Sequence, residues 1–479
     1  MLFNSLPYLI FIPIVFFSYW YIFNRSLKLQ NLFLIGASYL FYGWWDWRFL
    51  GLIIFSSTVD YLIGLQLGKT EKKKDRRSLL WISILVNVGF LGFFKYFNFF
   101  VESFIDAFSF FGLQLHANTL SIVLPVGISF YTFQTMSYTF DVYKKRVPPT
   151  NDVIAFFAYV SFFPQLVAGP IERAERFLSQ FLEKRSFNYG EAVDGMRQIL
   201  WGFFKKIAIA DNCAVYVDQI FGNPDAYPSS TLFLGAVLFA FQIYGDFSGY
   251  SDIAIGTARL FGFNLMQNFA YPYFSRDIAE FWRRWHISLS TWFRDYLYIP
   301  LGGSWGGKWL TVRNLFIIFI VSGFWHGANW TFIIWGALHA LYFLPLFLTE
   351  RNRVHMDVVA KNRWFPSIKE FFQIGITFLL TTFAWIFFRA ETVTGAWSYL
   401  SAIFSRDILA YPAGSGLTAV WHLLLFMIVI EWIQREESHG LTGGVFNNRF
   451  LRWALYFALF FMIMLLGNFT GSDFIYFQF

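Results

Sequence analysis

Long apolar runs recur along this chain, and short segments that carry many of its basic residues separate them. A helix needs about 20 mostly apolar residues to cross a bilayer, and many of the runs reach that length. Hydrophobic residues make up 57% of the chain and charged residues only 14%. Ordinary soluble domains contain about 25% charged residues, so one soluble core cannot account for this composition. The sequence therefore predicts an all-α integral membrane protein.

The runs are spread over the whole chain, which suggests one polytopic domain covering residues 1–479. They cover residues 2–23, 31–45, 49–68, 79–100, 120–143, 190–210, 231–250, 314–348, 371–388, 417–433 and 452–467. The run 314–348 is too long for one straight helix and contains three glycines, so we expect two helices there. Residues 153–170 are apolar but interrupted by prolines, which favours a re-entrant segment. We expect about ten to twelve crossings in total, with re-entrant and interfacial helices between them.

Basic residues follow alternate runs among the first five. Arg25 and Lys28 follow the first run, six basic residues lie between positions 69 and 77 after the third, and residues 144–146 follow the fifth. Cytoplasmic loops of membrane proteins carry an excess of lysine and arginine. The pattern predicts an extracytoplasmic N-terminus and a cytoplasmic 69–77 loop.

Other features exclude several classes of protein. The single cysteine, Cys213, rules out an intrachain disulfide and a cysteine-rich metal site. The net charge of +7 comes from loops between apolar runs, so it reflects topology and does not indicate a nucleic-acid partner. The sequence contains no P-loop, dinucleotide fingerprint, HExxH or GxSxG motif.

The segment 322–330 (SGFWHGANW) places one histidine, His326, inside an apolar run. Gly323 and Gly327 flank it and allow a second backbone or a ligand to approach closely. Burial disfavours the imidazolium form, and a neutral imidazole is what a general base requires. A histidine that is merely hydrogen-bonded between helices explains the same residues.

A second group of polar residues lies in the segment 276–298, whose aromatic residues gather on one face of a helical wheel. Arg283, Arg284 and Arg294 lie on the other face, and His286 lies at the boundary. The pattern predicts one amphipathic helix in the cytoplasmic interface of the membrane. Its arginines either anchor the helix or hold the phosphates of a thioester donor.

A third group, residues 242–252 (QIYGDFSGYSD), closes an apolar run with two carboxylates. Asp246 and Asp252 are suited to a water-filled entrance or to binding a sugar hydroxyl. They equally fit a helix end, with Asp252 as the N-cap of the next helix.

Several segments together resemble the membrane-bound O-acyltransferases of the alginate O-acetyltransferase type, and the resemblance covers nearly the whole chain. These segments are 41–48 (FYGWWDWR), 125–133 (PVGISFYTF), 163–171 (FPQLVAGPI), 246–256, 281–286 (FWRRWH), 294–303 (RDYLYIPLGG) and 325–327 (WHG). The last three are the most specific.

The resemblance implies the fold of that family and an acyl transfer, of acetyl in the alginate type. The donor would be a cytoplasmic thioester, acetyl-CoA or an acyl carrier protein, and the acceptor hydroxyls would belong to an extracytoplasmic polysaccharide such as alginate. It further implies that His326 is catalytic and that His286 lies in or near the active site. Asn329 is then a candidate to stabilise the oxyanion or to hold the acceptor.

The resemblance also implies a multi-pass protein of the bacterial cytoplasmic membrane that works with periplasmic acetyltransferase partners. No tightly bound cofactor and no metal are expected. Transfer of D-alanyl or another acyl group to a cell-envelope polymer stays open. So does a different class, a polysaccharide transporter or flippase in which His326 and Asp246 line the path. The discriminator is chemical, because a transporter makes no ester.

Overall fold

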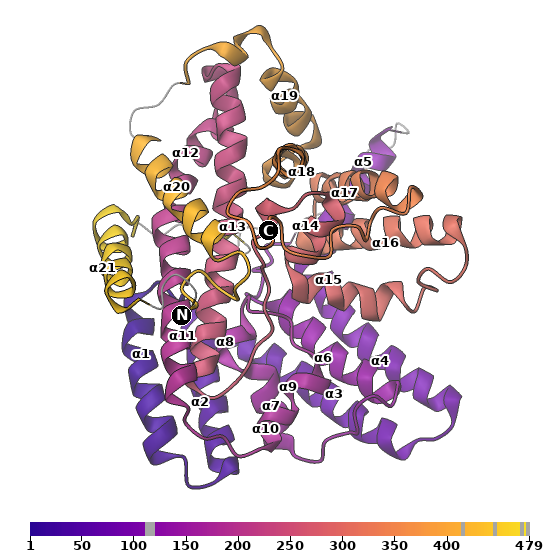
Figure 1. The fold of residues 1–479 in the computed structure, drawn as a ribbon. Helices are drawn as coiled ribbons and strands as arrows, with labels where there is room; N and C mark the ends of the chain where they lie inside the picture. Colours follow the sequence, from indigo (N-terminus) through magenta and orange to yellow (C-terminus); the bar gives the residue numbers. More distant parts are fainter. Residues whose placement is uncertain (111–119, 413–416, 444–447, 470–473, 476–479) are drawn as a thin grey trace. The chain divides into compact units, whose positions relative to one another are not determined.

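A computed structural model describes residues 1–110, 120–412, 417–443, 448–469 and 474–475. In these ranges the chain forms helices joined by loops, with no β-strand (Figure 1). Its contacts divide it into two compact units, which we describe separately. Unit 1 comprises Met1–Ala192 and Ala258–Leu265, and unit 2 comprises Val193–Thr257 and Met266–Phe479. The single domain expected from the sequence stays a prediction.

Unit 1 contains the helices α1 to α10. Their bounds are α1 Leu6–Phe17, α2 Leu27–Asp46, α3 Leu50–Lys69, α4 Lys73–Leu91, α5 Phe97–Phe110, α6 Ile128–Tyr143, α7 Val153–Ser161, α8 Phe163–Leu166, α9 Ala174–Phe177 and α10 Ser179–Leu182. Serine hydroxyls cap the first two helices: Ser5 accepts from the N–H of Tyr8, and Ser26 accepts from that of Leu29. α7 has nine residues, about 14 Å of helix, so it is too short to cross a bilayer and fits a re-entrant segment.

A buried polar network ties three helices of unit 1 together. Asp60 on α3 accepts hydrogen bonds from Asn87 on α4 and from Thr139 on α6, over 2.8 and 3.0 Å. Gly64, one turn further along α3, leaves room for the ring of Tyr138 on α6. Small residues and interhelical hydrogen bonds are what bring helices together in an apolar solvent.

Unit 2 contains the remaining helices. Their bounds are α11 Tyr189–Phe203, whose first turn belongs to unit 1, α12 Asp211–Gly222, α13 Ser229–Leu260, whose last three residues belong to unit 1, α14 Ile278–Arg284, α15 Ile287–Phe293, α16 Lys308–His326, α17 Trp330–Leu348, α18 Ile368–Arg389, α19 Val393–Ile403, α20 Leu417–Ile433 and α21 Arg449–Leu466. A π-helical segment, Phe204–Ala210, joins α11 to α12, and another, Arg294–Tyr298, follows α15.

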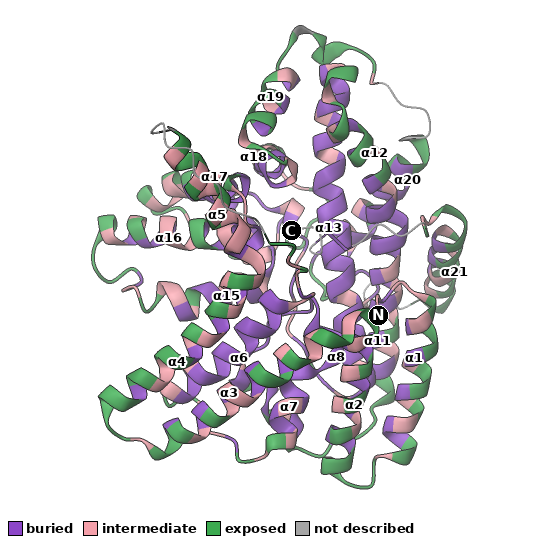
Figure 2. Ribbon diagram, turned by 180° about the vertical axis from the view of Figure 1, so that it is seen from behind, coloured by how far each residue is buried: buried purple, intermediate pink, exposed green. Residues whose placement is uncertain are grey.

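The longest helix, α13, is buried along most of its length (Figure 2). One of the alternatives for residues 242–252 was a helix end, with Asp252 as the N-cap of the next helix. That alternative is wrong, because the helix continues to Leu260. Both carboxylates lie within it and form ion pairs with lysines of the π-helical segment: Lys206 with Asp246 over 2.8 Å, and Lys205 with Asp252 over 2.6 Å.

The run 314–348 forms two helices, as predicted, and α16 and α17 lie side by side (Figure 1). Their backbones approach closely at Gly323, where a Cβ would collide with the carbonyl of Phe332, and at Gly336. The chain leaves α16 at Gly327, and the side chain of Asn329 caps α17. His326 is therefore the last residue of a helix and does not lie in the middle of one.

The prediction of a single amphipathic helix over 276–298 was also wrong. The backbone breaks between α14 and α15, where Trp285 is extended and His286 adopts left-handed dihedral angles, φ 43° and ψ 54°. The aromatic face is not exposed either, since Phe281, Trp285 and Trp292 are buried within unit 2. These rings pack inside the protein. In a surface anchor they would face the lipid instead.

Seven stretches of the described chain are long and apolar enough to cross a membrane. One of them, Leu27–Lys69, contains both α2 and α3, and two shorter apolar helical segments lie at Leu6–Ile22 and Thr418–Ile433. Part of the difference from the expected ten to twelve crossings follows from helices such as α6, which has 16 residues and falls short of a full crossing by length. The number of crossings stays a prediction.

Candidate active site

His326 ends α16 with its imidazole buried and held by the helix itself. Its Nδ1 lies 2.6 Å from the carbonyl oxygen of Ser322, one turn earlier. A carbonyl only accepts, so Nδ1 carries the proton in this bond, and the lone pair of the neutral ring is on Nε2. The bond thus orients the imidazole and presents the nitrogen that a general base uses.

His286 lies at the break between α14 and α15, in a backbone conformation that non-glycine residues rarely adopt. Its Nδ1 lies 3.0 Å from Oδ1 of Asn268, a buried residue of the loop before α14. Burial lowers the pKa of His286 well below its ordinary value of 6.5, and repulsion by His326 adds to the effect. His286 is therefore neutral at physiological pH.

The two histidines face each other within unit 2. Their ring centroids are 6.5 Å apart, with an interplanar angle of 78°, although 40 residues separate them in the sequence. We call His286 and His326 the histidine pair. Aromatic rings surround it: Phe247 is 4.6 Å from the ring of His286, and Trp335 and Phe388 are 5.0 and 5.5 Å from that of His326. Such walls exclude water and strengthen polar interactions inside.

Arg283 and Arg284 line an open cleft of about 490 Å³, together with Lys361 and Asp357. Arg283 donates to the carbonyls of Asn352 and His355, over 2.9 and 2.6 Å. Arg284 pairs with Glu280 over 2.9 Å and donates to the carbonyl of Asp357. The arginines therefore brace the loop before α18 and border the cleft at the same time.

The acidic residues of this cleft offset its basic ones. A hydrogen bond from Arg276 holds the pKa of Asp357 below its ordinary value, and Glu280 pairs with both Arg276 and Arg284. Arg294, the third predicted donor-binding arginine, does not line the cleft. It is exposed and pairs with its neighbour Asp295 over 2.7 Å.

Two further candidates from the sequence make structural contacts. The amide of Asn329 accepts from the N–H of Thr331 and donates to the carbonyl of Glu391, as a helix cap does. Asp246 is buried against Lys206 and also accepts from the backbone N–H of Ile475 over 2.7 Å. Neither is among the side chains that the structure places around the histidine pair.

The structure adds residues that the sequence did not single out. Asn268 contacts His286, and Trp335, Phe388 and Phe247 enclose the histidine pair. Only Phe247 lies in one of the three polar segments selected from the sequence, the one at 242–252. No local pattern distinguishes Trp335 and Phe388 from the many other aromatic residues of this chain. His339, a third histidine of unit 2, is also buried, and its Nδ1 accepts from the indole N–H of Trp282 over 3.2 Å.

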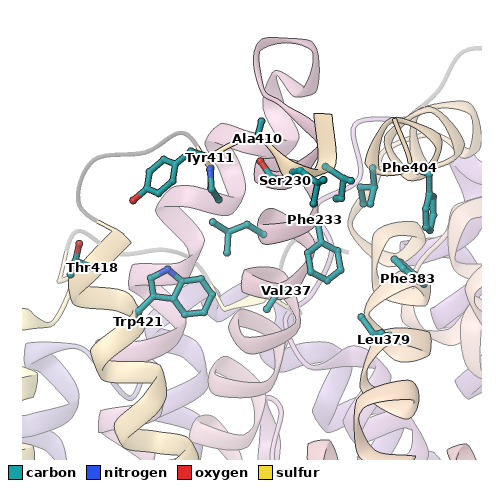
Figure 3. Close-up of a pocket in the computed structure, with 15 residues that line it drawn as sticks. Ser230, Phe233, Val237, Leu379, Phe383, Phe404, Ala410, Tyr411, Thr418 and Trp421 are labelled. Atoms are coloured by element: carbon teal, nitrogen blue, oxygen red, sulfur yellow. The ribbon is translucent and has the colours of Figure 1, made fainter. Parts of the chain in front are cut away.

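A second cavity, of about 1010 Å³, lies between α13, α18 and α20 (Figure 3). Phe233, Val237, Leu379 and Phe383 point into it, and hydroxyls line one end. Among the described residues that line it, none is a histidine, a carboxylate or a basic side chain, so these residues offer no general base. Across the described ranges, no cluster of three or more histidine, cysteine, aspartate or glutamate side chains is arranged to hold a metal ion.

The fold and this site define a class: an all-α protein with several apolar helices long enough to span a membrane, and a buried pair of histidines. Comparisons with known proteins agree. The profile of the membrane-bound O-acyltransferase family matches residues 148–363, which include both histidines.

Relatives with assigned names cover most of the chain. "Probable alginate O-acetylase AlgI" of Azotobacter vinelandii is 40% identical over 93% of this chain and 87% of its own length. The protein of the same name from Pseudomonas aeruginosa is 42% identical over 85% of this chain and 75% of its own length. "Peptidoglycan O-acetyltransferase" of Helicobacter pylori is 35% identical over 92% of this chain and 90% of its own length.

The chain belongs to the membrane-bound O-acyltransferase family. It is a multi-pass, all-α membrane protein and an acyltransferase. The family therefore decides against the transporter alternative.

Proposed function

We propose that this protein moves an acetyl group from a cytoplasmic thioester towards hydroxyls of an extracytoplasmic polysaccharide such as alginate. The observation that carries the proposal is the histidine pair, two buried imidazoles whose centroids are 6.5 Å apart and whose Nδ1 atoms are each held by an oxygen acceptor. The names of the relatives support acetyl as the group and a polymer of the cell envelope as the acceptor.

In this mechanism, Nε2 of His326 takes the proton of the acceptor hydroxyl as its oxygen attacks the thioester carbonyl. The C–O bond forms first, and the C–S bond then breaks as the tetrahedral intermediate collapses. The thiolate leaves, and the imidazolium of His326 returns the proton to it. The products are an ester and a free thiol. General-base assistance of this kind contributes about 10² to 10⁴ in rate.

The donor is proposed to dock at the cleft that Arg283, Arg284 and Lys361 border. Two observations support this position. Arg283 and Arg284 immediately precede the segment that carries His286, and Lys361 adds an exposed positive charge suited to a phosphate or an acidic carrier protein. No tightly bound cofactor takes part, and the donor is acetyl-CoA or an acetylated acyl carrier protein.

The site of action is proposed to be the bacterial cytoplasmic membrane, with periplasmic acetyltransferases that complete transfer to the polymer. D-alanyl transfer to a cell-envelope polymer is the second candidate, because the histidine chemistry is the same for any acyl thioester. The two candidates differ in the acyl group that the cell loses when the protein is removed.

The test compares the exopolysaccharide and cell wall of cells with and without the protein. The expected result is loss of acetyl esters from a surface polymer, restored by the wild-type gene. Loss of D-alanyl esters with unchanged acetyl esters would favour the second candidate. Unchanged ester content of every envelope polymer would contradict both.

A further inference from the structure

Asn268 contacts His286 directly, and the mechanism above assigns it no role. It is fully buried in the loop between α13 and α14. The side-chain contact, from His286 Nδ1 to Asn268 Oδ1, spans 3.0 Å. The backbone N–H of Ile287 also donates to the carbonyl of Asn268 over 2.9 Å. The loop therefore holds the break between α14 and α15 at two points.

The two ends of the Asn268 amide can be assigned from their partners. The backbone N–H of Ser288 lies 3.3 Å from the amide atom that faces His286, and its hydroxyl lies 2.9 Å away. A backbone N–H can only donate, so this amide atom is the oxygen. The other end, Nδ2, donates to the hydroxyl of Ser251 on α13 over 3.1 Å.

An amide oxygen cannot donate, so the proton of the bond between His286 and Asn268 is on the imidazole Nδ1. Two other buried histidines of unit 2, His339 and His439, have the opposite arrangement. His339 Nδ1 accepts from Trp282, and His439 Nδ1 accepts from the backbone N–H of Leu441 over 3.2 Å. Their surroundings place the proton on Nε2, so the state of His286 is specific to its neighbours.

We propose that Asn268 is a positioning residue that fixes the imidazole of His286 with its proton on Nδ1 and its lone pair on Nε2. The inference rests on the proposed function, in which His286 lies in the active site. His326 is held in the same state by the carbonyl of Ser322. Both rings then offer an acceptor at Nε2, which suits His286 to hold the acceptor hydroxyl and not to donate to an oxyanion.

The test reads the protonation of His286 separately from activity. Purified protein labelled with ¹⁵N-histidine is studied by NMR at neutral pH, and the His286 signals are assigned by their loss in His286→Gln. Wild-type His286 is expected to be protonated at Nδ1. Asn268→Ala is expected to give a mixture of tautomers, and Asn268→Asp, which keeps an acceptor oxygen, is expected to restore the single state.

Steady-state kinetics of the same variants give the second readout. Asn268→Ala is expected to lower kcat about tenfold or more, with the donor KM unchanged, and Asn268→Asp to recover most of the rate. Ser251→Ala is the matched control, since it removes the hydrogen bond at the other end of the same amide and leaves the oxygen that faces His286 in place. Its effect on kcat should be smaller than that of Asn268→Ala.

A wild-type His286 protonated on Nε2 would overturn the proposal, and so would an Asn268→Ala protein with unchanged tautomer and unchanged kcat. If Asn268→Ala does not fold, the wild-type spectrum and the Asn268→Asp protein still test whether Asn268 fixes the protonation state of His286. The proposed function fails by a different result, namely unchanged ester content of every envelope polymer in cells without the protein.

Discussion

Two groups of buried polar side chains in unit 2 differ in how their charge is balanced. In the lysine–aspartate cluster, Lys205 pairs with Asp252, and Lys206 pairs with Asp211 and Asp246, over 2.6 to 2.8 Å. In the histidine pair, each Nδ1 lies against an uncharged acceptor, a carbonyl oxygen for His326 and an amide oxygen for His286. Buried charges persist only when they are paired, whereas buried imidazoles persist by staying neutral.

The comparison distinguishes residues that stabilise the fold from residues that can transfer a proton. The buried carboxylates of the lysine–aspartate cluster are held by lysines of the neighbouring π-helical segment, so the cluster fixes the packing of α13. A neutral imidazole held at Nδ1 keeps a basic Nε2 for proton transfer. Asp246, a candidate site residue in the sequence, therefore has a structural role, and His326 has the chemical one.

The largest expected effect is on transfer by His326→Ala. Ester formation per milligram of folded, membrane-inserted protein should fall by about two orders of magnitude or more, because the general base is lost. The matched control is His422→Ala. His422 follows a tryptophan and has the same bond one turn back, Nδ1 to the carbonyl of Thr418 over 2.7 Å, but it is exposed. Equal losses of transfer activity in both variants would contradict a catalytic role that is specific to His326.

The next largest effect is expected on stability, when the lysine–aspartate cluster is broken. Lys206→Ala leaves Asp211 and Asp246 buried without their shared partner, which should cost about 3–5 kcal/mol of stability. The measurement is the thermal midpoint in detergent, together with the rate per folded molecule, which should stay near wild type. Arg48→Ala is the control, because its pair with Asp46 is screened by solvent and should contribute little to stability. Matching shifts for both variants would contradict the assignment.

A smaller effect is expected at the contact that places His326. In Gly323→Ala the new methyl group would collide with the backbone of Phe332, so α17 must shift, at a cost of about 1–3 kcal/mol. Trp335 lies on α17, so the rate per folded molecule should fall as well. Gly89→Ala, where nothing lies within 4 Å, should leave both quantities near wild type. A harmless Gly323→Ala would argue against the close packing of the two helices.

The smallest effect concerns the donor. Arg283→Ala should raise the apparent KM for the thioester donor by about twofold to tenfold, because it removes one charged group from the cleft border. Arg294→Ala, an exposed arginine outside the cleft, should leave the KM unchanged. If both variants have the same KM as wild type, Arg283 only braces the loop whose carbonyls it binds.

The sequence predicted the main parts of this comparison because their signals are local. Long apolar runs predict spanning helices, glycines near His326 predict a break, and a histidine in an apolar run indicates a special role. The motifs FWRRWH and WHG then pointed to His286 and His326 by resemblance to the family.

The errors have non-local causes. The 276–298 segment has a good helical pattern, yet the backbone breaks at His286, where the Asn268 loop bonds to it. Asp252 looked like an N-cap because nothing in its own segment reveals Lys205, which lies 47 residues earlier and neutralises it. The distance between the histidines likewise depends on how α14 to α17 pack, which spacing along the chain does not determine.

One side-by-side measurement tests the central claim most directly: ester formed in a single turnover per mole of folded, purified protein, for His326→Ala and Lys206→Ala. If the histidine pair performs the chemistry and the lysine–aspartate cluster supports the fold, His326→Ala will lose about a hundredfold or more while Lys206→Ala keeps the wild-type rate per folded molecule. Transfer at the wild-type rate by folded His326→Ala, or equal losses in the two variants, would contradict it.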